Sequence, residues 1–249
     1  MGDLKAQGII LKHRDIREAD RQLTVFTAEH GKIKVIAKGA RKAASKLAGS
    51  LEPFILSKLT IIRGRSLDTV TGSSVLKNYR HLKNDVKKVF LAGYISEVVC
   101  RATKENQPEP RIFDLLLEVF DFLDSHDGQK NYPGTWWYFI WRFLSYLGYH
   151  PDLFNCAVTK KKISPGAIFF SAHKGGVISG QSVSMPGGSA PISIGALKIL
   201  RSIYSQSLVE FKKIRLTQQL IKEINSLTKF YLSYTQEMDI PIKDFLIVA

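Results

Sequence analysis

The hydrophobic pattern of this chain changes its period near Tyr79, and that change limits the folds the chain can adopt. Before Tyr79, apolar residues alternate with polar ones, as in Lys32–Ala37, where Ile33, Val35 and Ala37 share one face. Alternation is the two-residue period of β-strands. After Tyr79, apolar residues recur at intervals of three and four, the period of helices. The sequence therefore predicts a small β-structure followed by a helical region.

Five strands are expected before this change, because each apolar stretch ends at a turn signal. They cover Gln7–Lys12, Leu23–Thr27, Lys32–Ala37, Phe54–Ile62 and Asp68–Val75. Five short strands in so short a segment favour a closed barrel or a sandwich. Helices are expected at 84–104, 110–126, 134–149, 193–206 and 215–235, with a short strand pair near 168–171 and 176–178 inside a loop-rich insert.

Positive charge is concentrated in the β-structure. The 249 residues carry a net charge of +14, and residues 1–80 hold 16 of the 36 Lys and Arg side chains but only 7 of the 22 Asp and Glu side chains. Such an excess favours a polyanionic partner. Only two cysteines occur, Cys100 and Cys156, which is too few for a disulfide framework and fits a reducing cytoplasm. No segment is apolar and long enough for a membrane span, so no membrane partner is expected.

The segment 37–47 is the strongest candidate for a binding site. It follows a strand and combines Gly39 and Ser45 with four cations, so that backbone N–H groups and charged side chains could track a phosphate backbone. The alternative to a binding site is a solvated basic loop without a ligand, which is the usual meaning of a short charge run. Neighbouring cations on strand 32–37 and in the turn 63–65 favour binding. The candidate DNA-binding residues are Lys32, Lys34, Lys38, Arg41, Lys42, Lys46, Arg63 and Arg65.

Signals for enzymatic chemistry are weak. The six histidines are scattered, and no phosphate-binding loop or nucleophile-elbow motif occurs. The carboxylates Asp114, Glu118, Asp121 and Asp124 recur at helical spacing, which is typical of a solvated helix face, although such a row could bind a metal. We therefore expect a binding protein without a catalytic residue or a cofactor, and a metal-dependent nuclease stays a less favoured alternative.

Several motifs resemble one family. The segment LTVFTAEHGKIKVIAKGARK, then Leu51–Phe54, and later Tyr94–Glu97 and Leu147–Leu153 are similar to the bacterial RecO recombination mediators. The resemblance implies an α+β architecture: a five-stranded OB-fold barrel in residues 1–80 and an all-helical domain in 81–249. It also implies a cytoplasmic, nucleoid-associated protein that binds single- and double-stranded DNA, anneals complementary strands, and acts with RecR and the C-terminal tail of single-strand-binding protein to promote RecA loading.

The resemblance also exposes a departure from the family pattern. Many members carry a zinc site built from two CxxC pairs, but the corresponding positions here are Cys156 with Thr159 and Ser179 with Ser182. A structural zinc site needs four Cys or His ligands, so we expect a metal-free, degenerate hairpin at about 150–190.

An aromatic cluster in the predicted helix 134–149 has two interpretations. Most of it must be core, because a helix that is apolar nearly all round is buried. The resemblance implies a second role, in which Trp137 and Trp141 line a groove for the tail of single-strand-binding protein and Arg142 pairs with its terminal carboxylate. An RNA-binding OB-fold module remains an alternative to the DNA-binding function, because composition does not separate the two.

Overall fold

The computed structural model describes residues 3–65, 67–125, 132–163, 166–179, 187–235 and 240. The chain packs as two units, Met1–Asp127 and Gly128–Ala249. Among the described residues, no helix is long and apolar enough to cross a membrane.

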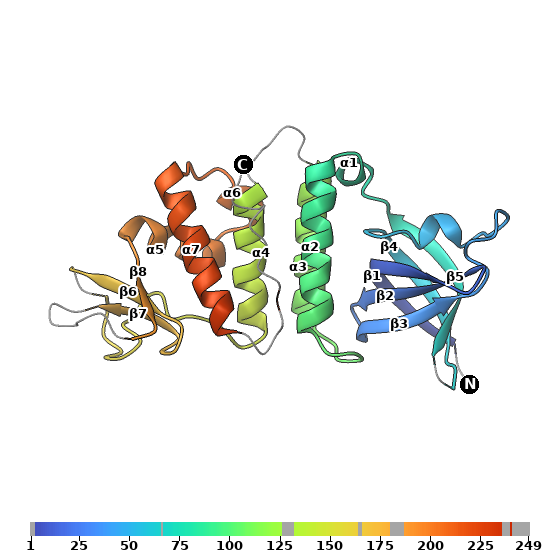
Figure 1. Cartoon of the computed structure of the whole chain (residues 1–249), viewed down its shortest axis with the longest axis horizontal. Helices are drawn as coiled ribbons and strands as arrows, with labels where there is room; N and C mark the ends of the chain where they lie inside the picture. Colours follow the sequence, from blue (N-terminus) through green and yellow to red (C-terminus); the bar gives the residue numbers. More distant parts are fainter. Residues whose placement is uncertain are drawn as a thin grey trace. The chain divides into compact units, whose positions relative to one another are not determined.

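The first unit begins with a closed barrel of five strands (Figure 1). These are β1 (Asp3–Ile16), β2 (Asp20–Thr27), β3 (Gly31–Ala37), β4 (Leu56–Ile62) and β5 (Asp68–Lys77). The strand order is β1-β2-β3-β5-β4, with β4 returning to β1 and only β3 and β5 running parallel. The predicted OB-type barrel is therefore confirmed.

Alternation along the strands fills the barrel. Leu23, Val25, Ile33 and Val35 point into one core, and the remaining core side chains come from the other strands and from the long β3–β4 loop. Burial of these aliphatic side chains is the main stabilising contribution. Phe54 was predicted to begin a strand, but β4 begins only at Leu56. The φ of Phe54 is +65°, which is not a strand conformation, so this residue belongs to the preceding loop.

A β-bulge changes which side chains of β1 face outward. Ile10 pairs with Val25 and lies in the core, but the next pair is Lys12 with Thr24, so Leu11 is an extra residue in β1. An extra residue reverses the in-and-out alternation beyond it. Without the bulge Lys12 would share the inward side of Ile10, whereas with it Lys12 points outward.

In the described part of the first unit, three α-helices follow the barrel: α1 (Arg80–Lys83), α2 (Val86–Ala102) and α3 (Pro110–Ser125). Asp85 caps α2 by accepting hydrogen bonds from the backbone N–H groups of Lys87 and Lys88. The short helix α1 was not predicted, because four residues are too few to show a helical period. Both long helices lie where the sequence predicts them.

The α2–α3 connection holds the barrel closely. The N–H of Asn106 donates to the Lys32 carbonyl at 2.9 Å. Gly31 (φ +64°) lies against the backbone of Gln107, and a Cβ added at Gly31 would be 1.8 Å from the Gln107 carbonyl oxygen. Only glycine fits this contact, because it has no Cβ and accepts a positive φ. The start of β3 is thereby fixed to the segment that joins α2 to α3.

Among its described residues, the second unit contains four helices, α4 (Tyr132–Tyr146), α5 (Ile194–Ser205), α6 (Leu208–Phe211) and α7 (Gln218–Tyr234). A small antiparallel sheet in the order β7-β6-β8 is built from β6 (Ile168–Ser171), β7 (Gly176–Ser179) and β8 (Ser189–Pro191). The predicted strand pair is present as β6 and β7. Helix α6 and strand β8 were not predicted, because both are too short to carry a periodic pattern.

The predicted boundary between domains 1–80 and 81–249 does not coincide with the division between these two units. The barrel ends at Lys77, but α1, α2 and α3 pack in the same unit as the barrel. The division at residue 80 stays a prediction.

Candidate nucleic-acid interface

The outer surface of β1, β2 and β3 is organised in rows that run across the three strands. The pairing registers give three successive rows, which are Ile9–Phe26–Lys32, Lys12–Thr24–Lys34 and Arg14–Gln22–Ile36. Neighbouring strands lie about 4.8 Å apart, so the outer members of a row are about 10 Å apart. The first row is called the covered row here, and the other two are the open rows.

The covered row is buried. Ile9 and Phe26 are fully buried, and Lys32 is only 7% exposed. The Lys32 ammonium donates hydrogen bonds to the carbonyl oxygens of Cys100 and Thr103 at the C-terminal end of α2. A cation satisfies the unpaired carbonyl groups and the negative end of a helix dipole. Burial lowers the pKa of Lys32.

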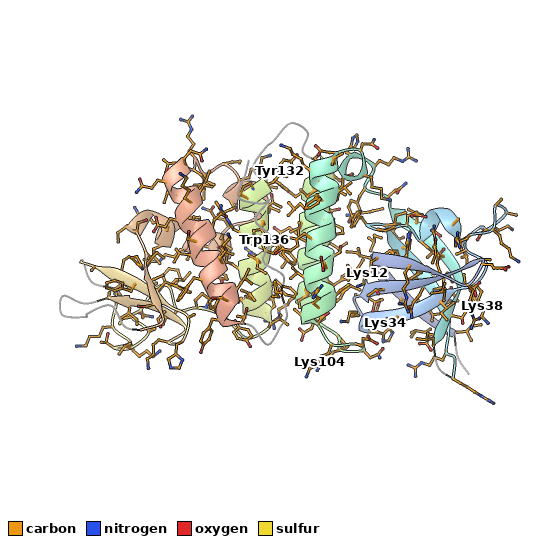
Figure 2. The ribbon with its side chains drawn as sticks, in the orientation of Figure 1. Lys12, Lys34, Lys38, Lys104, Tyr132 and Trp136 are labelled. Carbon is orange, nitrogen blue, oxygen red and sulfur yellow. The ribbon has the colours of Figure 1, made fainter. Side chains whose placement is uncertain are left out.

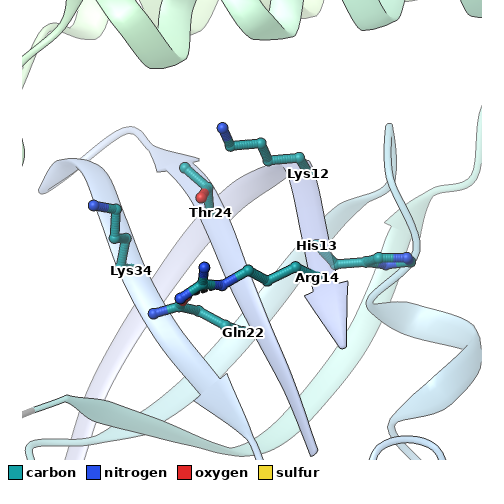
Figure 3. Close-up of a pocket in the computed structure, with 6 residues that line it drawn as sticks. All are labelled: Lys12, His13, Arg14, Gln22, Thr24 and Lys34. Atoms are coloured by element: carbon teal, nitrogen blue, oxygen red, sulfur yellow. Dashed lines mark hydrogen bonds between the residues drawn. The ribbon is translucent and has the colours of Figure 1, made fainter. Parts of the chain in front are cut away.

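The open rows surround a hollow of about 400 Å³, lined by Lys12, His13, Arg14, Gln22, Thr24 and Lys34 (Figure 3). We call these residues the cationic face. Figure 3 shows the Lys12 and Lys34 ammonium groups pointing the same way on either side of Thr24. Arg14 Nε donates to Gln22 Oε1 at 2.7 Å, which fixes the guanidinium across the strands. The hollow therefore presents three cations to one side.

The carboxylate of Glu105 partly neutralises this face. Lys34 Nζ lies 2.5 Å from Glu105 Oε1, and both side chains are close to half exposed. An exposed ion pair is worth little in water, so an incoming phosphate can replace the carboxylate at low cost.

The basic loop that follows β3 is anchored to the β1–β2 hairpin. The N–H of Gly39 donates to Asp20 Oδ1 at 2.8 Å, and the N–H of Arg41 donates to the Ala19 carbonyl at 3.0 Å. The Arg41 guanidinium also contacts Asp15 Oδ2 at 3.2 Å and the Glu18 carbonyl at 3.1 Å. Each anchor fixes a backbone or guanidinium position and leaves the loop's lysines to solvent, since Lys38, Lys42 and Lys46 are exposed.

The structure divides the predicted cations among separate places. Lys34 lies on the cationic face, and the basic loop with Lys38, Arg41, Lys42 and Lys46 follows the other end of β3; Figure 2 shows Lys38 well apart from Lys12 and Lys34. Arg63 lines a second hollow together with His30 and Asp68, beside the start of β3. Arg65 is exposed in the same β4–β5 loop. Lys32 is turned into the covered row, so we do not include it in the interface.

Sequence reasoning missed Lys12 and Arg14. Both lie beyond the bulge, and simple alternation from Ile10 would place them inside the barrel. A polar residue at an expected core position is the one signal that could have pointed to a bulge here. The aromatic rings of the barrel strands are no part of this surface, because Phe26 is completely buried and Phe54 packs edge-on against Phe120 at 5.9 Å between ring centroids.

The predicted tail groove contains residues that are engaged in the second unit's own core. Trp137 and Trp141 are fully buried, and their Nε1 atoms donate to Asn225 Oδ1 at 2.8 Å and Thr228 Oγ1 at 3.0 Å. Arg142 donates to the carbonyl oxygens of Ile203 and Gln206 at the end of α5, at 2.7 and 2.6 Å. Nothing in this arrangement supports the groove prediction for these three residues.

The degenerate zinc positions do come together in part. Cys156 is buried and free, and its thiol accepts hydrogen bonds from the Thr159 hydroxyl and from backbone N–H groups, including that of Ser179. Burial raises the pKa of Cys156, but these hydrogen bonds outweigh burial and lower the pKa to about 7. Ser182 lies outside the described residues. Within the described part of the chain, no three His, Cys, Asp or Glu side chains are grouped so that they could hold a metal ion.

The acidic row on α3 is committed to the fold at two positions. Asp121 accepts a hydrogen bond from Lys77 Nζ at 2.7 Å, and Asp124 accepts from the backbone N–H of Leu82 at 2.9 Å, next to the start of α1. These contacts support a structural role for the row.

An OB-type barrel with a cationic strand face belongs to a class of nucleic-acid-binding folds. Comparison with known sequences narrows the class. The family described as "Recombination protein O N terminal" matches residues 1–79, and "Recombination protein O C terminal" matches residues 83–242. The chain belongs to the RecO family of DNA repair proteins.

Curated relatives span almost the whole chain. The DNA repair protein RecO of Pelotomaculum thermopropionicum is 31% identical over 97% of this chain and 93% of its own length. The RecO of Dehalococcoides mccartyi (strain ATCC BAA-2266) is 30% identical over 95% of this chain and 92% of its own. The RecO of Desulfitobacterium hafniense (strain DSM 10664) is 30% identical, covering 94% and 86% respectively.

Proposed function

We propose that this protein is a recombination mediator, not an enzyme, that binds single-stranded DNA across the cationic face and the basic loop. The observation that carries the proposal is the outward turn of Lys12, Arg14 and Lys34 around one hollow of an OB-type barrel. The hollow lies on the strand face that OB-folds use for oligonucleotides. Three cations on one side give a surface complementary to a phosphate backbone.

The chemistry of this interface is electrostatic. Phe26 is buried, and none of the residues that line the hollow is Phe, Tyr or Trp, so base stacking contributes little there. Phosphate contacts carry no sequence information, and binding should be tolerant of sequence and sensitive to salt. Neutralising the phosphates of two strands lowers their mutual repulsion, which favours annealing of complementary strands. Double-stranded DNA should bind through the same cations.

The proposed partners follow from the family. We propose that the protein acts in the cytoplasm at the nucleoid, with RecR and with the C-terminal tail of single-strand-binding protein, and so promotes RecA loading. We assign no residues to the RecR surface. For the tail we also leave the residues open, because Trp137, Trp141 and Arg142 make internal contacts.

The first test is the binding of a fluorescent single-stranded oligonucleotide across a salt series. The double variant Arg41→Ala/Lys42→Ala should bind more weakly, with a salt slope smaller by about 0.7 for each phosphate that is no longer neutralised. A matched control is Lys5→Ala/Lys58→Ala, which removes two exposed cations from the β1–β4 side of the barrel. An unchanged affinity and slope in Arg41→Ala/Lys42→Ala would remove the basic loop from the interface.

Two further arms separate the mediator from its alternatives. Competition with RNA of the same sequence tests the RNA-binding module, since recognition of RNA would use the 2′-hydroxyl. Incubation of labelled DNA with Mg²⁺ or Mn²⁺ tests the nuclease, which would shorten the oligonucleotide. A ternary complex with single-strand-binding protein that requires its C-terminal tail would support the mediator role, whereas DNA binding without tail dependence would reduce the proposal to a general single-strand binder.

A further inference from the structure

Residues 153–163 of the second unit form a small two-stranded turn that we call the knuckle. The N–H of Cys156 donates to the Lys161 carbonyl at 2.8 Å, Asn155 pairs with Lys162, and the N–H of Lys160 donates back to the Cys156 carbonyl at 2.8 Å. At the tip, Lys160 has a φ of +59°. The thiol of Cys156 is held inside by the hydrogen bonds described above. Backbone hydrogen bonds therefore define the shape of the knuckle.

The knuckle presents an exposed aromatic ring. Phe154 is 60% exposed, although its backbone N–H is fixed by Asp152 Oδ1 at 3.1 Å. The guanidinium of Arg201 lies 4.8 Å from the ring centroid. Arg201 is itself held by two hydrogen bonds to the Leu153 carbonyl, at 2.8 and 2.7 Å. The ring thus has an exposed surface beside a fixed guanidinium, which is a place where another flat ring could stack.

Positive charge surrounds this ring. Lys160, Lys161 and Lys162 are exposed, and among the described residues no carboxylate lies within ion-pair distance of their ammonium groups. Lys162 is paired with Asn155, the neighbour of Phe154. Backbone hydrogen bonds from Asn155 and Phe154, together with the charge of Lys160, lower the pKa of the nearby Asp152 carboxylate, so one negative charge offsets part of the three positive ones. The knuckle thus combines a stacking surface with a net positive charge.

We propose that the knuckle is a second single-strand binding element, in which a base stacks on Phe154 and the lysines 160–162 contact the flanking phosphates. An exposed ring beside an excess of cations is the combination that binds single-stranded nucleic acid without sequence preference. The cationic face has the charges but no such ring, so the two elements bind by different means. The proposal goes beyond DNA binding by the barrel and does not depend on it: a second strand held here would bring two strands to one protein.

An acidic peptide is the competing occupant. Such a peptide would need the lysines, but it would gain little from a flat aromatic ring in place of a leucine side chain. Nucleic acid is favoured because the arginine held at the ring by Leu153 supports a base stack by cation–π attraction.

The test places a reporter at the ring. The three native tryptophans are buried, so Phe154→Trp in the full-length chain adds an exposed indole whose emission a stacked base quenches. Titration with oligo(dT) should quench this emission. Lys160→Ala/Lys161→Ala/Lys162→Ala in the same background should lower the affinity measured by this quenching about tenfold. A charge-matched control, Lys213→Ala/Arg215→Ala/Lys222→Ala, removes three exposed cations elsewhere in the second unit and should leave the titration unchanged.

A second variant separates stacking from charge. Phe154→Leu keeps the apolar volume but removes the ring, and it should weaken binding at the knuckle about fivefold, the lower end of what one stacked base contributes. The affinities of Phe154 and Phe154→Leu for oligo(dT) are compared in an Arg14→Ala/Lys34→Ala background, so that binding by the cationic face does not mask the change.

The outcomes distinguish this proposal from the proposed function. No quenching of Phe154→Trp, while anisotropy still reports salt-dependent binding by the barrel, overturns the knuckle proposal alone. Quenching that persists when Arg14→Ala/Lys34→Ala changes neither affinity nor salt slope supports the knuckle and counts against the barrel interface. A response to an acidic peptide but not to oligo(dT) assigns the knuckle to a protein partner and also overturns the proposal.

Discussion

The covered row and the open rows of the barrel are built on the same three strands, yet they have opposite roles. Lys32 and Lys34 are two residues apart on β3 and point to the same side of the sheet. The first is buried against the end of α2, and the second lies on the cationic face. The difference arises because the end of α2 reaches only the first row. A lysine on this surface therefore contributes to folding or to binding according to the helix next to it.

The largest expected effect is on the covered row. Lys32→Met keeps most of the apolar stem but leaves the carbonyl groups of Cys100 and Thr103 without their donor, which should lower the free energy of unfolding by about 2 to 4 kcal/mol. Urea denaturation followed by circular dichroism measures this decrease. Lys34→Met is the matched control and should change stability by less than about 1 kcal/mol, because its ion pair is exposed. Equal decreases in the two variants would contradict the distinction between the rows.

The second prediction concerns the DNA affinity of the open rows. Arg14→Ala/Lys34→Ala should reduce affinity for oligo(dT) about tenfold at low salt and lower the salt slope by about 1.4, which corresponds to two phosphate contacts on a single strand. Fluorescence anisotropy across a salt series gives both values.

Lys32→Met supplies the control for this binding experiment. At a temperature where the variant is folded, its salt slope should equal that of the unchanged protein. If the salt slope fell with Lys32→Met but not with Arg14→Ala/Lys34→Ala, the covered row would bind DNA and the open rows would not, which would contradict the prediction.

Much of the fold follows from the sequence, because period alone separates barrel from helices. Alternation in Lys32–Ala37 correctly gives the inward faces of Ile33 and Val35. Alternation also groups Lys32 with Lys34 as outward residues, and both do point to the outer side of β3. It does not report that the end of helix α2 covers Lys32. Such a contact joins residues about 70 positions apart in the chain, as in Lys32 with Cys100 and Thr103, and no local pattern reports it.

The candidate site was predictable only in part for a similar reason. The basic loop is visible as a run of cations in the sequence, but Lys12 and Arg14 reach the surface only because Leu11 is an extra residue in β1. The bulge depends on how β1 pairs with β2, which a single strand does not reveal. In the second unit, the composition of the aromatic cluster does not distinguish a groove from a core, and the hydrogen bonds of Trp137 and Trp141 to α7 are long-range contacts.

The smallest expected effect comes from Glu105, the carboxylate that partly neutralises the cationic face. Glu105→Gln keeps the side-chain shape but removes the charge that competes with a phosphate for Lys34. DNA affinity should rise about two- to threefold at low salt and return to the unchanged value at high salt, because exposed charges are screened there. Glu109→Gln is a control in the same connection, since Lys34 forms its ion pair with Glu105 and not with Glu109. An affinity that does not respond to Glu105→Gln would mean that DNA does not reach Lys34, and the interface would then have to lie on the basic loop alone.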